Sequence, residues 1–97
     1  MLNIVSTAQI QSEKATFRII VMDVNQEPIV GAVVDITGVG TGTTDVEGVV
    51  QFLLKPLGIY DITISHHGYV TQQLQRMAPT AGYIYVIRVF LNEAPPV

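Results

Sequence analysis

The residues best suited to chemistry in this chain are two adjacent histidines, His66 and His67. Imidazole is a common metal ligand and the usual general base near neutral pH. Adjacent side chains of a strand point to opposite faces, and those of a turn diverge, so a shared metal would need ligands from distant segments. No cysteine is present to supply a thiolate ligand. The pair therefore predicts an exposed turn that holds neither a metal nor a cofactor.

Two further groups of residues allow a chemical interpretation. Glycine and threonine recur over residues 38–44 as in a phosphate-binding loop, but the lysine of a P-loop and a following helical pattern are both missing. Asp45, Glu47 and Asp61 assure too few oxygen ligands at one place for calcium, and capping of a turn accounts for Asp45. No Ser–His–Asp or Cys–His spacing emerges either. We therefore predict that the chain is not an enzyme.

The composition excludes some partners and favours others. Only 13% of the 97 residues are charged, against about 25% in an average domain, and the mean hydropathy is +0.41. The net charge of -3 provides no basic patch to neutralise phosphates, which argues against nucleic acid. No stretch resembles a membrane span, and residues 1–10 lack the basic start of a signal peptide. A small domain this apolar is expected to leave hydrophobic groups outside its own core.

Turn-forming residues divide the chain into short segments rich in β-branched residues. The three clearest turns fall at residues 25–28, 44–48 and 66–69. Segments spaced at about ten residues are typical of a β-sandwich. The predicted strands span residues 16–24, 29–37, 43–44, 49–54, 59–65, 70–77 and 83–91. We predict an all-β fold: a Greek-key, Ig-like or prealbumin-like antiparallel β-sandwich of about seven strands.

The sandwich domain is expected to occupy residues 15–92. Residues 1–14 are predicted to form an N-terminal arm. Residues 93–97 are predicted to form a Pro-containing C-terminal tail that cannot continue a sheet.

Glycine and asparagine mark the places where the backbone must turn sharply. Gly31 indicates a bulge within the second strand, and the glycines of residues 38–42 indicate a flexible loop. Asn25 can tolerate a left-handed backbone in the first turn. Gly48 is expected to permit the tight reversal that follows Asp45.

Residues 23–32, 44–48, 58–65 and 68–69 form a pattern, in this order, that covers about two-thirds of the chain. In these segments the chain resembles the carboxypeptidase regulatory-like domain. The resemblance implies a transthyretin-like sandwich, and it implies little about activity, since such domains are usually accessory modules of secreted enzymes, outer-membrane transporters, adhesins and virus particles. The chain departs from the pattern at Gln26, where the family usually has Gly. Transthyretin-like hydroxyisourate hydrolases share the architecture, but their Tyr-Arg-Gly-Ser terminus is missing here.

The last predicted strand is apolar on both faces. The face assigned to the core carries Tyr83, Tyr85, Ile87, Val89 and Leu91. The other face carries Ile84, Val86 and Phe90 beside Arg88. A strand covered on one side normally alternates apolar with polar residues, so the second face needs a cover from the arm, the tail or another subunit. We predict that Ile84, Val86 and Phe90 contact a partner protein, because the arm is short and half polar.

Two functions are compatible with these expectations. The first is a non-catalytic structural component of a larger assembly, in particular a small phage virion protein of a tail, baseplate or capsid decoration. It would be assembled in the host cytoplasm with other protein subunits, as a homo-oligomer or with virion proteins. The second is a carbohydrate- or peptide-binding accessory module of a surface adhesin or secreted enzyme, extracellular if a signal peptide was removed. Its ligand could be a surface glycan, although the chain has no Trp to stack on sugar rings.

Overall fold

The computed structural model describes residues 14–55 and 58–95. The predicted arm at residues 1–14 therefore lies outside the described residues, apart from Lys14. No helix in these two ranges is long and apolar enough to cross a membrane.

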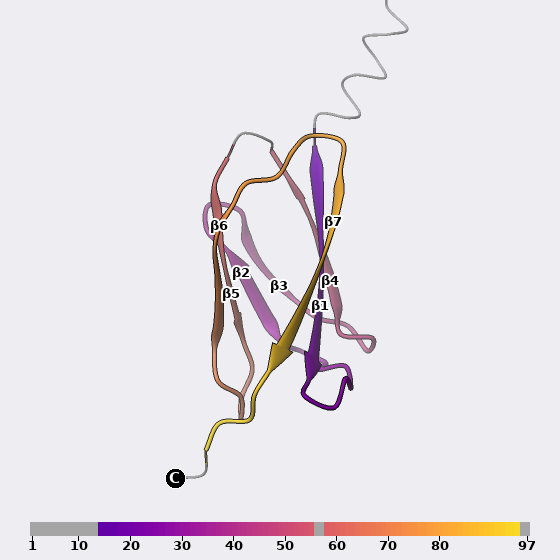
Figure 1. The fold of residues 1–97 in the computed structure, drawn as a ribbon, viewed down its shortest axis with the longest axis vertical. Helices are drawn as coiled ribbons and strands as arrows, with labels where there is room; N and C mark the ends of the chain where they lie inside the picture. The colour runs from indigo at the N-terminus through magenta and orange to yellow at the C-terminus, as the bar shows by residue number, and fades with distance from the viewer. Residues whose placement is uncertain (1–13, 56–57, 96–97) are drawn as a thin grey trace, which may run out of the picture.

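Within the described residues, seven strands form two sheets that pack face to face (Figure 1). The strands are β1 (Ala15–Asp23), β2 (Val33–Ile36), β3 (Gly40–Thr43), β4 (Val49–Leu54), β5 (Tyr60–Ser65), β6 (Gln72–Met77) and β7 (Ile84–Leu91). The smaller sheet has the order β4-β1-β7, and the larger one has the order β3-β2-β5-β6. The predicted all-β sandwich of about seven strands is confirmed, and one of its ladders is parallel where an antiparallel sandwich was predicted.

Among these seven strands every ladder is antiparallel except the one between β1 and β7, which is parallel. The direction of β7 follows from where it begins. The loop after β6 brings the chain to the end of the sandwich where β1 starts, and there Gly82 N–H donates to the Lys14 carbonyl at 3.0 Å. Thr16 N–H donates to the Tyr83 carbonyl, also at 3.0 Å. Two neighbouring strands that start at the same end must run parallel.

The core lies between the sheets and is built from the alternating residues that the sequence predicts. Phe17, Ile19 and Val21 of β1 are completely buried, as are Ile62 and Ile64 of β5. Burying one such side chain stabilises the fold by about 1.5–3 kcal/mol. The further buried members of the core are Ile29, Ala32, Val34, Ile36, Leu54, Val89 and Leu91.

The second strand is shorter than predicted, and the glycine loop after it contains a strand that the sequence did not predict there. The chain turns at Gly31, whose φ of 77° favours glycine, so β2 begins only at Val33. Gly40 to Thr43 then pair with β2 as β3. A Cβ at Gly42 would lie 3.0 Å from side-chain atoms of both Val50 and Phe52. The missing side chain therefore lets β3 lie against β4.

Two turns at one end of the sandwich have the same construction. An Asp23 carboxylate oxygen accepts the N–H groups of the second and fourth residues after it at 2.8 and 3.0 Å. An Asp45 carboxylate oxygen accepts the equivalent groups at 2.9 and 3.0 Å. The third residue after each aspartate has a left-handed backbone: Gln26 with φ 66° and Gly48 with φ 79°. The expected cap at Asp45 and turn at Gly48 are present, whereas the left-handed residue of the first turn is Gln26 and not Asn25.

Thr44 is a buried polar residue that holds the turn before β2. Its hydroxyl donates to the Ile29 carbonyl at 2.6 Å and accepts the Ala32 N–H at 2.8 Å. Its backbone carbonyl accepts the Gly31 N–H at 3.0 Å. One side chain thereby satisfies two main-chain groups that would otherwise be buried without a partner.

Candidate interaction surface

The outward side chains of the three-stranded sheet form one continuous surface, which we call the outer face of β4-β1-β7. The strand registers place these side chains in rows that run across the sheet. The rows are Leu53–Thr16–Ile84, Gln51–Arg18–Val86, Val49–Ile20–Arg88 and Met22–Phe90. Strands in a sheet lie about 4.8 Å apart, so successive members of one row are direct neighbours.

The three residues that the sequence singled out for a partner all lie on this surface. Ile84 is 69% exposed, Val86 is 49% exposed and Phe90 is 44% exposed. They alternate along β7 with the inward residues, as predicted, but Tyr83, which was also assigned to the core face, precedes the strand and is 61% exposed. Their contact with a partner stays a prediction, but their side chains are available for one.

The neighbouring strands extend this apolar surface beyond the residues that the sequence singled out. Leu53 of β4 is 65% exposed and shares a row with Ile84. Ile20 and Met22 of β1 are half-buried and lie in the last two rows. The alternation of residues 16–24 places Ile20 and Met22 on the outward face, but it does not reveal that this face adjoins β7.

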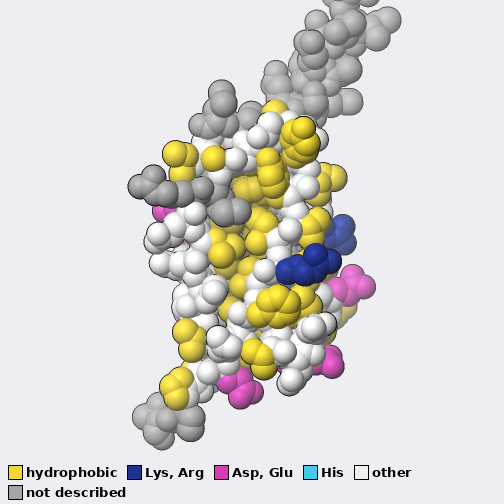
Figure 2. All heavy atoms as spheres, in the orientation of Figure 1, with side chains coloured by type: hydrophobic (Ala, Val, Ile, Leu, Met, Phe, Trp, Pro, Cys, Tyr) yellow, Lys and Arg dark blue, Asp and Glu magenta, His cyan; other side chains and the backbone are white. Residues whose placement is uncertain are grey.

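The charges on the outer face of β4-β1-β7 are basic. Arg18 and Arg88 lie in adjacent rows, and the outward residues of these three strands include no Asp or Glu. Figure 2 shows apolar atoms over the part of the molecule that β7 crosses, with basic side chains among them. An apolar surface that carries arginine has the composition of a protein interface more than that of an ordinary surface.

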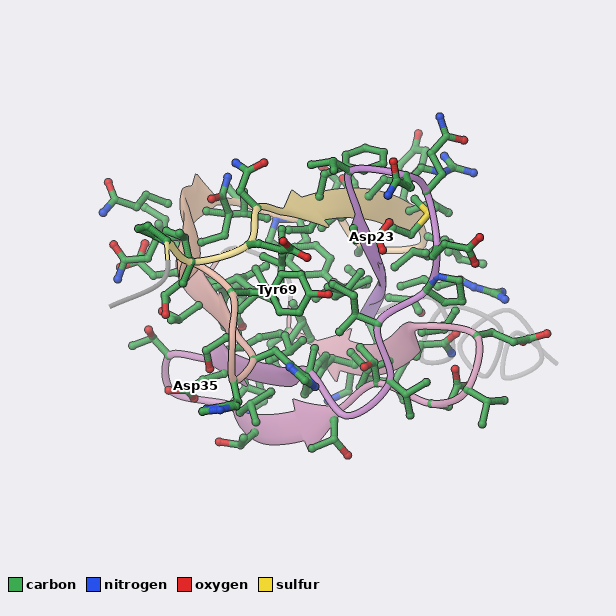
Figure 3. All side chains as sticks on the ribbon, turned by 90° about the horizontal axis from the view of Figure 1, so that it is seen from below. Asp23, Asp35 and Tyr69 are labelled. Atoms are coloured by element: carbon green, nitrogen blue, oxygen red, sulfur yellow. The ribbon has the colours of Figure 1, made fainter. Side chains whose placement is uncertain are left out.

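The opposite face of the sandwich has a different character. The outward residues of the larger sheet form the rows Thr43–Val33–Ser65 and Thr41–Asp35–Thr63–Gln73. Hydroxyl and amide groups dominate there, with Val33 as the exposed aliphatic residue of these rows. In Figure 3, which looks onto one end of the sandwich, Asp35 lies on the side of this sheet and Asp23 lies toward β7.

Two inward residues of β7 are less well covered than the other two. Tyr85 and Ile87 are half-buried, whereas Val89 and Leu91 are 3% and 1% exposed. The Tyr85 ring meets Phe17 edge to face at 5.6 Å between centroids, and its hydroxyl accepts the Thr80 N–H at 2.8 Å. Hydrogen bonds from Thr80 hold the pKa of the Tyr85 phenol below its ordinary value.

The histidine pair lies in the turn after β5, as predicted, but its two members differ. His67 is exposed, whereas His66 is half-buried. The expectation of an exposed pair is therefore wrong for His66. Its Nε2 lies 3.0 Å from the Val30 carbonyl oxygen, and its Nδ1 lies 2.9 Å from the His67 carbonyl oxygen. A protonated ring can donate to both oxygens and a neutral ring to one, so this side chain ties two loops together.

His66 also packs against Tyr69 at the end of the sandwich. The two rings meet edge to face with centroids 5.6 Å apart. Tyr69 lies between the two sheets in Figure 3 and forms an isolated antiparallel bridge with Glu93. The predicted tail thus still pairs with the sandwich at its first residue. Among residues 14–55 and 58–95, no three His, Asp or Glu side chains are placed to hold a metal ion.

No protein-family model matches the chain, and no curated protein matches it either. Solved β-sandwich structures do match the chain. Over 84% of its length the chain superposes on 17% of the Bacillus anthracis TIE protein, with a TM-score of 0.64 and 19% identity. A streptococcal ancillary pilin matches over 87% of this chain and 34% of its own, with a TM-score of 0.64 and 16% identity.

A third similar structure is a type II cohesin–X-dockerin complex from Acetivibrio cellulolyticus. It matches over 80% of this chain and 56% of its own, with a TM-score of 0.53 and 21% identity. At these identities the likenesses show the fold alone. The chain spans about a sixth of the TIE protein and about a third of the pilin.

Proposed function

We propose that the chain is a non-catalytic structural module that joins a larger protein assembly through the outer face of β4-β1-β7. One observation carries this proposal. Leu53, Ile84, Val86 and Phe90 are all exposed on one face of the sandwich, whereas the opposite face is dominated by hydroxyl and amide groups. Large apolar patches on a soluble domain mark sites of interaction.

The two arginines on this surface indicate what kind of partner can cover it. Arg18 and Arg88 lie among apolar side chains, so a partner that covers them must supply carboxylates or carbonyl oxygens at matching positions. A protein surface with an apolar centre and acidic groups meets this requirement. The partner is therefore another protein subunit, a second copy of this chain or a different protein.

We propose a phage virion as the setting, with the chain as a small tail, baseplate or capsid-decorating protein assembled in the host cytoplasm. A low content of charge and the absence of cysteine support a domain that relies on packing in an assembly. We also propose that the chain is a divergent carboxypeptidase regulatory-like domain. Support for this comes from Gln26, since the position where that family usually has Gly is left-handed here.

The second candidate is an accessory module of a surface adhesin or secreted enzyme, with a peptide or a glycan as its ligand. Its support is the likeness in fold to the TIE protein and the ancillary pilin, in which the matching part is a fraction of a longer chain. In this case the chain would be one domain in a series. Binding of glycan or peptide by an isolated monomer would favour this second candidate.

The experiment that tests the first candidate is light scattering over a dilution series with two matched variants. Val86→Lys places a charge on the outer face of β4-β1-β7, and Val33→Lys places the same charge on the opposite sheet. We expect the wild type and Val33→Lys to exceed the monomer mass of 10.6 kDa as concentration rises, and Val86→Lys to remain monomeric. A wild type that is monomeric throughout and is taken up by no particle contradicts the proposal.

A further inference from the structure

One long edge of the smaller sheet is open. Within the described residues β7 pairs with β1 alone, so its second edge presents main-chain groups along eight residues. Natural edge strands are usually protected by Pro, by charged side chains such as Lys, or by a bulge. β7 contains no Pro, Arg88 is its one charged residue, and its ladder with β1 is regular from Ile84 to Leu91.

The core is also incompletely covered on the side of that edge. Contacts between β3 and β4 place those two edge strands on one side of the sandwich, so β7 and β6 border the other side. The inward residues Tyr85 and Ile87 of β7 and Leu74 of β6 pack on the core but remain half-buried, as do Val50 and Phe52 of β4 on the opposite side, where β3 already lies against β4. A strand added to β7 would cover this seam if its inward side chains were apolar.

The segment before β1 has the sequence that such a strand needs. Its even-numbered residues are mostly apolar, and its odd-numbered residues are mostly polar. The first set is Leu2, Ile4, Ala8 and Ile10, with Ser6 as its polar member, and the second is Asn3, Thr7, Gln9 and Gln11, with Val5 as its apolar member. This period of two is typical of a strand that is covered on one side, and residues 2–10 match the length of β7.

We propose that residues 2–10 of a second copy of this chain add as a strand to the open edge of β7. This inference rests on the proposed function and names its partner. The donated strand would supply main-chain hydrogen bonds to β7 and place its apolar side chains over the seam, as in other cases of strand addition. Copies linked in this way form a closed dimer if the exchange is mutual and a chain of subunits if it is not.

The copy that donates the strand is not the one that receives it. At Lys14 and Thr16 the chain is already bonded beside β7 through Gly82 and Tyr83. To reach the open edge of its own β7, the chain would have to reverse and cross that strand, a lateral distance of about 10 Å. Residues 11–13 (Gln-Ser-Glu) would have to do both within three residues, of which Ser12 alone is a common turn-forming type.

A disulfide test identifies the donor because the chain contains no cysteine. Thr7→Cys and Val86→Cys are made in separate full-length chains, which are distinguished by mass, mixed and oxidised. The polar side of the arm and the outward side of β7 should face the same way, so we expect a mixed disulfide dimer. The yield should exceed that of Thr7→Cys with Val33→Cys about tenfold, because pairing raises the effective concentration of the thiols.

Two further variants separate a specific strand from a chance encounter. Ile10→Asp, added to the Thr7→Cys chain, puts a charge into the seam and should lower the yield of mixed disulfide about tenfold, whereas Gln11→Asp should not. Equal yields for these two variants would overturn the proposal. So would disulfide homodimers of Val86→Cys alone, which indicate pairing of two β7 edges, or a cyclised monomer when both cysteines are in one chain.

The experiments distinguish a failure of the strand exchange from a failure of the proposed function. If Val86→Lys abolishes assembly while no mixed disulfide forms, the outer face contacts its partner without the arm and the strand exchange is wrong. If the mixed disulfide forms in the ratios given above, the arm is the connecting element.

Discussion

Gln26 and Gly48 occupy the same position in two turns of the same construction, three residues after Asp23 and Asp45, and both have a left-handed backbone. The turns meet at Val21. Its N–H donates to the Gly48 carbonyl at 2.8 Å, and its carbonyl accepts the Ile29 N–H at 3.0 Å. The left-handed position of the turn is therefore occupied by glycine in one case and by glutamine in the other.

Gly48 should be the less replaceable of the two. A Cβ there would lie 2.5 Å from the Val21 carbonyl oxygen, closer than real side chains approach. Because Gly48→Val also strains the left-handed backbone, we expect it to lower the free energy of unfolding by at least about 1–3 kcal/mol. Urea denaturation checks this, and unchanged stability would show that the turn is not formed as described.

Gln26→Gly should have the opposite effect. A non-glycine residue in the left-handed region is strained by about 1–2 kcal/mol, and Gln26 is exposed, with its N–H bonded to the Asp23 carbonyl. We expect the glycine variant to raise the midpoint of urea denaturation, by roughly 0.5–1 kcal/mol of stability. Gln26→Ala is the control and should be nearly neutral. A destabilised glycine variant would mean that the Gln26 side chain makes a stabilising contact.

Thr44 should matter through its hydroxyl alone. Thr44→Val keeps the shape but leaves the Ile29 carbonyl and the Ala32 N–H without their buried partner. We expect a loss of about 1–3 kcal/mol in the free energy of unfolding. Thr43→Val, at an exposed neighbouring position, is the matched control and should change stability little. Equal effects of the two variants would contradict the role given to the Thr44 hydroxyl.

The two histidines should also differ in how much each contributes to stability. His66→Ala removes the contact with the Val30 carbonyl and the ring contact with Tyr69, so thermal unfolding should begin at a lower temperature, with a loss of about 1–2 kcal/mol. His67→Ala should leave the transition where it is, because that side chain is exposed. If both variants behave like the wild type, the ring of His66 does not tie the loops together in solution.

Substitutions on the inward face of β7 should affect folding, and substitutions on its outward face should affect assembly. Ile87→Ala shortens an inward, half-buried side chain and should lower the free energy of unfolding by about 1–2 kcal/mol. Phe90→Lys changes an outward residue and should leave the unfolding transition of the monomer intact while it abolishes incorporation into the assembly. Calorimetry and light scattering on the same samples check both expectations. An assembly that accepts Phe90→Lys would place the interface elsewhere.

The sequence predicts the strands and their inward faces because these depend on local alternation and on turn-forming residues. Phe17, Ile62 and their neighbours follow from the period of two, and β4 has the predicted bounds. The parallel direction of β7 cannot be predicted in this way, since it depends on the path of a loop through space. Nor can β3, whose glycines suggest a loop until the side chains of Val50 and Phe52 occupy the room they leave.

The candidate surface is predictable only in part for the same reason. Ile84, Val86 and Phe90 can be identified because a single strand shows both of its faces in its own sequence. Leu53 joins them only through the register of β4 with β1. The buried role of Thr44 is equally non-local, because its two partners lie 15 and 12 residues away in the chain.

The parallel ladder of β1 and β7 has a mechanical consequence. The chain enters β1 at one end of the sandwich and leaves β7 at the other, so the first and last strands of the described residues are neighbours (Figure 1). A pull on the two ends acts along this ladder and loads its eight residue pairs in shear. Bonds loaded in shear must break together, whereas a perpendicular pull opens them one by one. The fold therefore resists tension along its long axis more strongly than tension across it.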